Sequence, residues 1–235
     1  MREIIDAALR RQRRIVLIAV TAGLAVGLFS RWADSVDAPL SLLGLVAPLV
    51  VIVFGIREFT HRPPTGDLRV DEAGRAFVAP PRARIAFAPV LMGWLAYAAV
   101  DGAGPPLLTA LLVAVLGWLV VALWRNAPLV VLTAEKISVG TAPAIVVPWE
   151  ALGTTGAVAE GTARTRLAVT RSELVRPRWK GRFPVDLPTR DLAVAPALLA
   201  AAIGHYAARP EHRAAIGTAA EHARLRRELT GERPS

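Results

Sequence analysis

A basic cluster around one tryptophan is the segment whose residue types best suit binding. It reads RSELVRPRWKGR over residues 171–182. Arginine and lysine side chains attract anionic headgroups, and an indole ring enters the membrane interface. We therefore predict contact with an anionic membrane surface; a solvated hairpin tip, or contact with protein or nucleic acid, are the alternatives. The candidate contact residues are Arg171, Arg176, Arg178, Trp179, Lys180 and Arg182.

Two glycines four residues apart form a pattern that favours close packing of helices. Gly23 and Gly27 lie within an apolar stretch and form a G-x-x-x-G pattern. Because they carry no β-carbon, such positions let two helix backbones approach closely in a membrane. The pattern predicts packing within the protein's own helix bundle or, alternatively, a homodimer face.

Catalytic and metal-binding patterns are missing from the sequence. Cysteine is absent, and the chain has no G-x-x-x-x-G-K-[ST], H-E-x-x-H or G-x-S-x-G motif. The four histidines are scattered, so we expect solvated or helix-capping side chains rather than metal ligands: His61, His205, His212 and His222. We expect no catalytic residue, no metal and no cofactor, and hence no enzyme.

Four apolar stretches occupy much of the first half of the chain. Residues of the set AVILMFWYC make up 54% of the chain, and the mean hydropathy is +0.43. A bilayer core about 30 Å thick needs roughly 20 helical residues. The two longer stretches reach this length alone, and the two shorter ones reach it if Arg14 and Arg84 snorkel. We predict four transmembrane helices, around the charge-free segments 15–29, 39–56, 85–100 and 105–124.

The distribution of charge sets the predicted orientation. The net charge is +9, and 27 of the 28 basic residues, all except Arg31, fall in the N-terminal tail, the loop 57–84 and the region after residue 124. Lysine and arginine avoid the translocated side of a membrane. We therefore expect a multi-pass protein of a bacterial cytoplasmic (inner) membrane with both termini in the cytoplasm. No clear A-x-A site follows the first stretch, which argues against a cleaved signal peptide.

The region after residue 124 changes to short alternating apolar patterns that are typical of strands. A helix is expected from Pro196, with apolar residues at helical spacing until Pro210 interrupts it. Thr218 and Glu221 form a capping-box pattern for a last helix over 219–229. Short strands at this spacing predict a small antiparallel sandwich or barrel covered by a helix. The predicted strands are 129–132, 137–139, 144–149, 154–159, 165–170 and 182–187.

This order of elements resembles the pleckstrin-homology (PH)-like domains of bacterial membrane proteins, notably the actinobacterial type. The stretch VVLTAEKISVG is similar to their opening hairpin, IVVPWEAL to the next strand, and LAVAPALLAAAIGHYAARPEHRAAIGT to the closing helix and its trailer. The resemblance covers residues 128–220 and implies a fold and a membrane setting, since most such members are uncharacterised. Inositide-binding members of the wider class use basic residues around the first turn. The turn TAEK here has one lysine, so that specificity is not implied.

The loop between the second and third apolar stretches has a hairpin pattern of its own. The segment LRVDEAGRAFV (68–78) predicts strand, turn and strand, with the turn at 71–74. An isolated two-stranded hairpin is marginal in water, so we expect it to dock on the C-terminal domain. Two apolar stretches followed by a hairpin occur twice along the chain. This suggests an internal duplication, with coincidence as the alternative.

The predicted fold class is a membrane α-helical part with four transmembrane helices plus a cytoplasmic α+β PH-like domain. We expect a scaffold or accessory role without catalysis. The expected partners are the lipid bilayer and its anionic headgroups, an unidentified membrane or cytoplasmic protein, and a second copy in a homodimer, but no nucleic acid. The predicted segments are a basic tail (1–14), transmembrane hairpin 1 (15–56), a β-hairpin loop (57–84), transmembrane hairpin 2 (85–124), the PH-like domain (125–209) and a C-terminal helix and tail (210–235).

Two other classes of function stay open at this point. A transporter or channel subunit needs ionisable groups at membrane depth, and the four stretches contain no Asp, Glu, Lys, Arg or His. A membrane enzyme would have only Asp67, Asp71 and Glu72 near the membrane boundary, and these residues also suit a turn.

Overall fold

The computed structural model divides into two compact units. The helical unit comprises Leu9–Arg62 and Arg84–Arg125, and the α+β unit comprises Met1–Ala8, Pro63–Ala83 and Asn126–Ser235. Each unit is therefore built from separate pieces of the chain. The described residues are 2–35, 49–50, 53, 56, 65–82, 87–101, 105–141, 144–160, 164–177 and 185–230.

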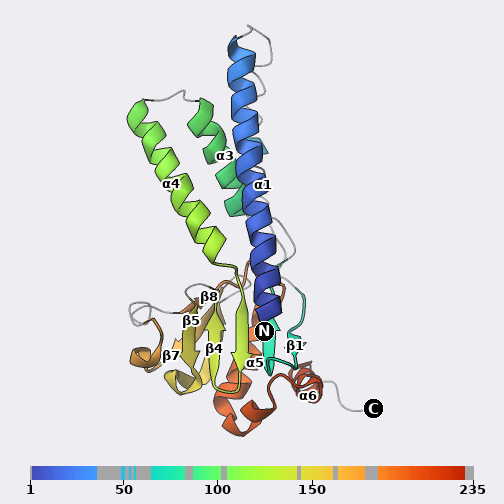
Figure 1. Cartoon of the computed structure of the whole chain (residues 1–235). Helices are drawn as coiled ribbons and strands as arrows, with labels where there is room; N and C mark the ends of the chain where they lie inside the picture. The colour runs from blue at the N-terminus through green and yellow to red at the C-terminus, as the bar shows by residue number, and fades with distance from the viewer. Residues whose placement is uncertain are drawn as a thin grey trace. The chain divides into compact units, whose positions relative to one another are not determined.

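The described part of the helical unit contains three long helices, α1 (Arg2–Ser35), α3 (Phe87–Asp101) and α4 (Pro106–Arg125) (Figure 1). In α1 the segment Asp6–Ala33, and in α4 the whole helix, are long and apolar enough to cross a membrane by length and composition. Helix α3 has 15 residues and is shorter than a full span. The predicted second span, 39–56, lies outside the described residues except for four helical positions.

A five-stranded antiparallel sheet in the order β1-β2-β3-β4-β5 forms one face of the α+β unit. The predicted hairpin from the middle loop supplies β1 and β2, and β2 pairs directly with β3, with Phe77 opposite Leu132. Its predicted docking on the C-terminal domain is thus confirmed. All four residues of β2 are buried, which an isolated hairpin could not achieve. The strands are β1 (Arg69–Asp71), β2 (Ala76–Ala79), β3 (Val130–Thr133), β4 (Lys136–Val139) and β5 (Ile145–Pro148).

A second antiparallel sheet contains β6 (Leu152–Glu160), β7 (Arg164–Val169) and β8 (Asp186–Leu187). Helix α5 (Pro196–Ala208) packs closely on β6. The approach is tight because Gly156 has a φ of +67°, and a β-carbon there would lie 2.9 Å from the Cα of Gly204. The predicted strand 182–187 lies partly outside the described residues; within its described part, 185–187, Asp186 and Leu187 form β8.

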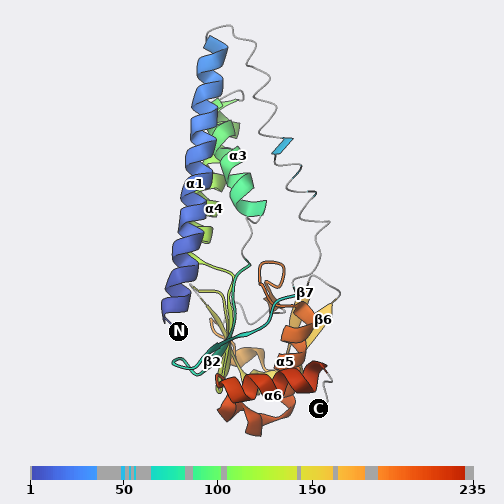
Figure 2. The ribbon, with the colours of Figure 1, turned by 90° about the vertical axis from the view of Figure 1, so that its right-hand side faces the viewer.

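The last part of the chain packs into the same α+β unit. A short 3₁₀ helix, η4 (Pro210–Ala215), follows α5, and α6 (Ala219–Thr230) lies across the lower end of α5 in Figure 2. Two further 3₁₀ turns, η2 (Trp149–Ala151) and η3 (Ser172–Leu174), follow β5 and β7. Leu225 of α6 and Tyr206 of α5 join one buried cluster with Phe77 and Trp149. The predicted boundary at residue 210 therefore separates segments that share one core.

Candidate functional site

At each end of the helical unit, one arginine side chain donates a hydrogen bond to a backbone carbonyl oxygen of another helix. At one end, Arg13 donates from Nε to the carbonyl oxygen of Trp124 (3.4 Å), and its guanidinium lies 5.4 Å from the centre of the Trp124 ring. At the other end, Arg31 donates to the carbonyl oxygen of Val100 (3.2 Å). The two arginines are eighteen positions apart along α1, or about 27 Å at 1.5 Å per residue. This spacing is close to the thickness of a hydrocarbon core, about 30 Å.

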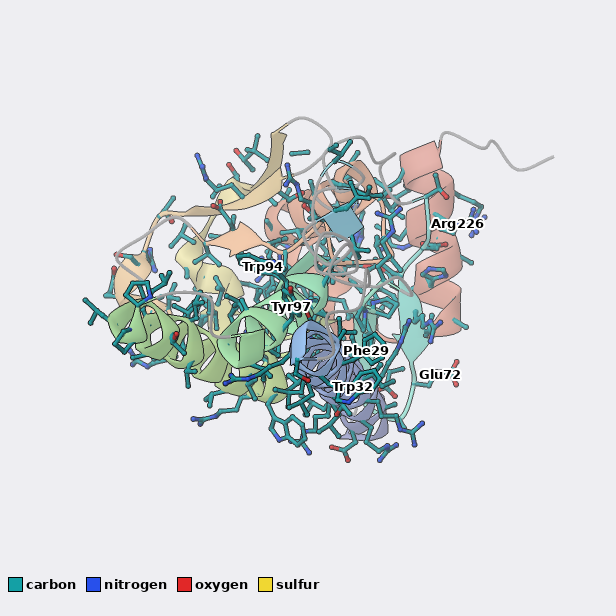
Figure 3. The ribbon with its side chains drawn as sticks, turned by 90° about the horizontal axis from the view of Figure 1, so that it is seen from above. Phe29, Trp32, Glu72, Trp94, Tyr97 and Arg226 are labelled. Carbon is teal, nitrogen blue, oxygen red and sulfur yellow. The ribbon has the colours of Figure 1, made fainter. Side chains whose placement is uncertain are left out.

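Large apolar side chains cover the helices between these two levels. Helix α4 has no buried residue, and the exposed fraction reaches 82% at Leu107 and 70% at Trp118. Contiguous exposed apolar surface of this kind marks contact sites for membranes or other proteins. The rings of Phe29 and Trp32 on α1 pack at a tilt of 39° with their centres 5.7 Å apart (Figure 3). Further exposed apolar residues are Leu17, Ile18, Leu24, Val26, Leu28, Leu108, Leu111, Val113, Val115 and Val121.

The two glycines of the G-x-x-x-G pattern both face α3 of the same chain. A β-carbon added at Gly23 would overlap the backbone of Gly93. A β-carbon at Gly27 would lie 3.0 Å from the carbonyl oxygen of Tyr97 and 3.0 Å from the β-carbon of Val100. This geometry corresponds to packing within the bundle. The predicted alternative, a homodimer face, would have to use other positions of α1.

The structure describes only part of the predicted basic cluster. Arg171 and Arg176 are exposed. The backbone of Arg176 forms a two-way bridge to Val146 of β5, with N···O distances of 2.8 and 2.9 Å. The bridge holds the start of the cluster against the five-stranded sheet. The other predicted contact residues lie outside the described residues: Arg178, Trp179, Lys180 and Arg182.

Two of the three acidic residues considered for a membrane enzyme, Asp67 and Asp71, have structural contacts, and the third, Glu72, is exposed. Asp71 accepts a hydrogen bond from the Gly74 N–H (3.0 Å), as a turn residue does. One carboxylate oxygen of Asp67 lies 3.4 Å from His222 Nε2, and the other lies 3.3 Å from Arg226 Nε, both on α6. Asp67 therefore connects the middle loop to the last helix.

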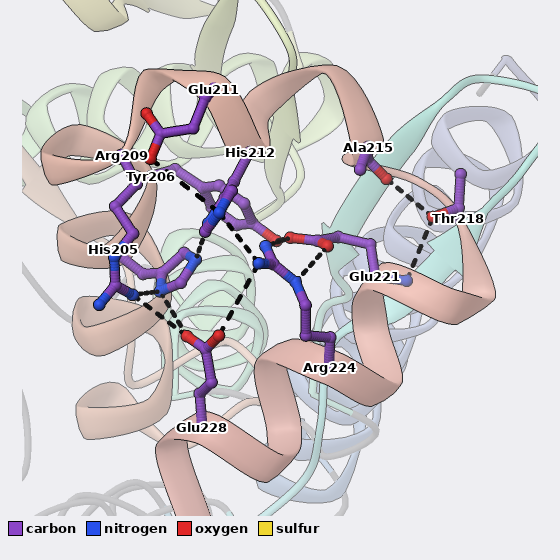
Figure 4. Close-up of polar contacts among 10 residues, drawn as sticks. All are labelled: His205, Tyr206, Arg209, Glu211, His212, Ala215, Thr218, Glu221, Arg224 and Glu228. Carbon is purple, nitrogen blue, oxygen red and sulfur yellow. Dashed lines mark hydrogen bonds and ion pairs between the residues drawn. The ribbon is translucent and has the colours of Figure 1, made fainter.

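A buried polar network, not foreseen from the sequence, joins α5 to α6. The Tyr206 hydroxyl donates to Glu221 Oε1 (2.9 Å), and Arg224 donates to both Glu221 oxygens (2.6 and 2.8 Å) (Figure 4). Burial and the bond to Glu221 raise the pKa of Tyr206 well above its ordinary value. Burial alone would raise the pKa of Glu221, but the hydrogen bonds from Arg224 and Tyr206 outweigh it and hold that pKa below its usual range.

The predicted capping box at the start of α6 is only half formed. The Glu221 N–H donates to the Thr218 hydroxyl (3.2 Å), as the pattern requires. The Thr218 N–H, however, donates to the carbonyl oxygen of Ala215 (3.2 Å). The Glu221 carboxylate cannot return to Thr218 because Tyr206 and Arg224 occupy both of its oxygens.

Two histidines meet in the same corner. His205 Nε2 and His212 Nδ1 are 3.0 Å apart, and the two rings stack with centres 5.1 Å apart. The expectation of a solvated or helix-capping side chain is wrong for His205, whose ring is 4% exposed and contacts the side chains of His212 and Glu228. Burial lowers the pKa of His205 further than Glu228 raises it. Their separation of seven residues, across the break at Pro210, is the one signal that could have predicted the pair.

No metal-binding arrangement accompanies this pair: the described part of the chain contains no group of three or more His, Asp or Glu side chains able to hold a metal ion. No protein-family model, curated protein or solved structure shows a significant match to this chain.

Proposed function

We propose that this chain is an integral protein of a bacterial inner membrane, with four spans and both termini in the cytoplasm. Its cytoplasmic α+β unit is a PH-like binding module that contacts a protein partner and the anionic bilayer surface. In this proposal the protein acts as a scaffold or accessory subunit and not as an enzyme.

The spacing of Arg13 and Arg31 along α1 is the observation that carries the membrane assignment. Both arginines are held by carbonyl oxygens at helix ends, and the large exposed side chains of α1 from Leu17 to Phe29 are apolar. A bilayer favours helices that have charged groups at the two interfaces and apolar side chains in contact with the lipid chains between them. Trp124 and Trp32 at these levels support the same proposal, because aromatic rings concentrate at membrane interfaces.

The order of elements in the α+β unit supports the PH-like part of the proposal. Six of the described strands, β3 to β8, form antiparallel ladders before a C-terminal helix packs on β6. The strands β1 and β2 come from the middle loop and extend the first sheet beyond β3. They are therefore an addition to the PH-like order of elements. The exposed Arg171 and Arg176 supply positive charge next to β5.

Site-specific photocross-linking in native membranes tests the binding role. A photoreactive residue replaces Arg176, and the same residue at the exposed position Ala220 is the matched control. We expect adducts with lipid or with another protein from position 176, and few from position 220. Recovery of only self-linked products from both positions would argue against a binding module.

A further inference from the structure

A row of exposed side chains runs along one face of α1, within the helical unit. Its positions are spaced alternately by four and three residues, which is the spacing of a single face of an α-helix. The row begins with two arginines and continues with three leucines and one threonine, and all of them are exposed. Its members are Arg10, Arg14, Leu17, Thr21, Leu24 and Leu28. This face of α1 therefore carries two cations at its start and mainly apolar side chains beyond them.

The two arginines at the start of this row lie about one helix turn apart. Side chains at positions i and i+4 of a helix are neighbours, with β-carbons about 5–6 Å apart. Neither Arg10 nor Arg14 forms a hydrogen bond or an ion pair with any described residue. Asp6, one turn before Arg10, is exposed as well, and no acidic residue follows in α1 before Asp34. Like charges at this spacing destabilise a helix, and an anion bound between them would remove that cost.

Arg13, the neighbour of Arg14 in the sequence, has a different environment. Its guanidinium is held by the carbonyl oxygen and the ring of Trp124 on α4. Consecutive residues of an α-helix differ by about 100° around its axis, so Arg14 lies on a different face from this contact. The level at which we place the membrane interface thus has one arginine bound within the protein and two arginines, Arg10 and Arg14, that can bind an external anion.

The leucines of the row extend from these arginines by the thickness of one bilayer leaflet. Leu24 lies ten positions after Arg14, or about 15 Å at 1.5 Å per residue. A hydrocarbon core about 30 Å thick has leaflets of about 15 Å each. Leu17 is 53% exposed and Leu24 is 38% exposed. The acyl chains of a lipid whose headgroup lies at the two arginines would therefore contact both leucines.

We propose that this face of α1 binds one anionic phospholipid, with the phosphodiester between Arg10 and Arg14 and the acyl chains along Leu17 and Leu24. The inference rests on the membrane assignment proposed above. A guanidinium donates parallel hydrogen bonds to phosphate oxygens, so arginine suits this group. The leucines favour a lipid over a soluble phosphate, which has no apolar part to place on them. A second copy of the chain suits this face less well, because a parallel pair in the membrane would bring four such arginines together.

Native mass spectrometry of the full-length protein, released from detergent micelles, tests the proposal. The probes are phosphatidylglycerol, phosphatidylcholine with the same acyl chains, and soluble glycerol phosphate. The wild type should retain phosphatidylglycerol in preference to phosphatidylcholine, and it should retain no glycerol phosphate. The double substitution Arg10→Gln and Arg14→Gln should lower the ratio of bound phosphatidylglycerol to bound phosphatidylcholine by up to about 25-fold, since each basic residue near an anionic surface contributes about fivefold. The matched control, Arg69→Gln with Arg190→Gln, removes two exposed arginines of the α+β unit and should keep the wild-type ratio.

Equal ratios in the wild type and in the variant at positions 10 and 14 would overturn the proposal. Retention of glycerol phosphate as strongly as of phosphatidylglycerol, or a dimer that carries no lipid, would overturn it too. Alkaline carbonate extraction of membranes separates this failure from failure of the membrane assignment, because an integral protein stays in the membrane pellet. Release of the wild-type chain would contradict the membrane assignment itself, whereas a pelleted protein without lipid preference would contradict the lipid site alone.

Discussion

The two units of this protein differ in how many of their large apolar side chains are exposed. In the α+β unit, Phe77, Leu132 and Tyr206 are fully buried, and polar side chains pair with one another in and around the core. In the helical unit, α4 buries no residue, and the arginine contacts lie at the two ends of the helices.

If the proposed membrane assignment is right, this contrast reflects two different solvents. Water favours the burial of apolar side chains. Lipid chains are as apolar as these side chains, so a bilayer does not favour their burial, and a bilayer confines charged groups to its interfaces. Substitutions that move apolar or polar groups should therefore have different effects in the two units. The predictions below follow from this comparison.

The largest effect is expected in the core shared by the middle loop and the C-terminal region. Phe77→Ala removes a fully buried ring that contacts Tyr206 and His222, and should lower the free energy of unfolding of the α+β unit by about 3–5 kcal/mol. Leu111→Ala on the exposed face of α4 is the matched control and should leave that free energy unchanged. Chemical denaturation in detergent, followed by circular dichroism, measures both. Equal losses for the two variants would remove the contrast between the units.

A charge in the middle of α4 tests the same contrast from the membrane side. Leu111→Arg should raise the apparent free energy of membrane insertion by about 2.5–3.5 kcal/mol, since charged groups are costly at the bilayer centre. A glycosylation-based insertion assay measures this quantity for the helix. An unchanged inserted fraction would mean that α4 does not lie at membrane depth.

The glycines of the helical unit provide a smaller test with an internal control. Gly23→Ala should destabilise the packing of α1 on α3 by about 1–3 kcal/mol, because the new methyl group overlaps the backbone of Gly93. Gly117→Ala on α4 meets no atom within 4 Å and should be neutral or slightly stabilising. Thermal unfolding in detergent compares the two variants. A similar loss of stability at both positions would mean that Gly23 is not specifically needed for the packing of α1 on α3.

The smallest predicted effect is the dependence of the α+β unit on acid. The pKa of Glu221 is lowered in the folded state, so its contribution to stability is present above the ordinary value of 4.5 and is lost as the pH falls through the folded value. Tyr206→Phe should cost about 1–2 kcal/mol at pH 7 and weaken this dependence, because one of the bonds that holds the carboxylate ionised is gone. Denaturation midpoints at pH 7 and pH 3.5 test it. An identical pH dependence in both proteins would show that Tyr206 does not stabilise the ionised carboxylate.

Much of the fold could be predicted because the signals are local. Period-two apolar patterns marked β3, β4 and β5, and Pro196 and Pro210 marked the limits of α5. The docking of the middle-loop hairpin on the C-terminal domain could be predicted, because an isolated hairpin has no surface on which to bury its apolar side chains. The pairing of β2 with β3 could not, because it depends on a contact between distant segments.

The candidate site depended on contacts that no local pattern contains. His205 and His212 meet only because η4 turns the chain back after Pro210. Glu221 left its expected capping bond because Tyr206, fifteen residues earlier, competes for its carboxylate. Such competition between a local motif and a tertiary contact is decided by the fold as a whole.

The direct test of the membrane assignment is the accessibility of two single cysteines in intact cells. Ser35→Cys lies at the end of α1 beyond Arg31, and Ala220→Cys lies at an exposed position of α6. With a membrane-impermeant maleimide, Ser35→Cys should react in intact cells, whereas Ala220→Cys should react only after the membrane is permeabilised. Reaction of Ala220→Cys in intact cells, or of Ser35→Cys only after permeabilisation, would contradict a protein that crosses the membrane with its α+β unit in the cytoplasm.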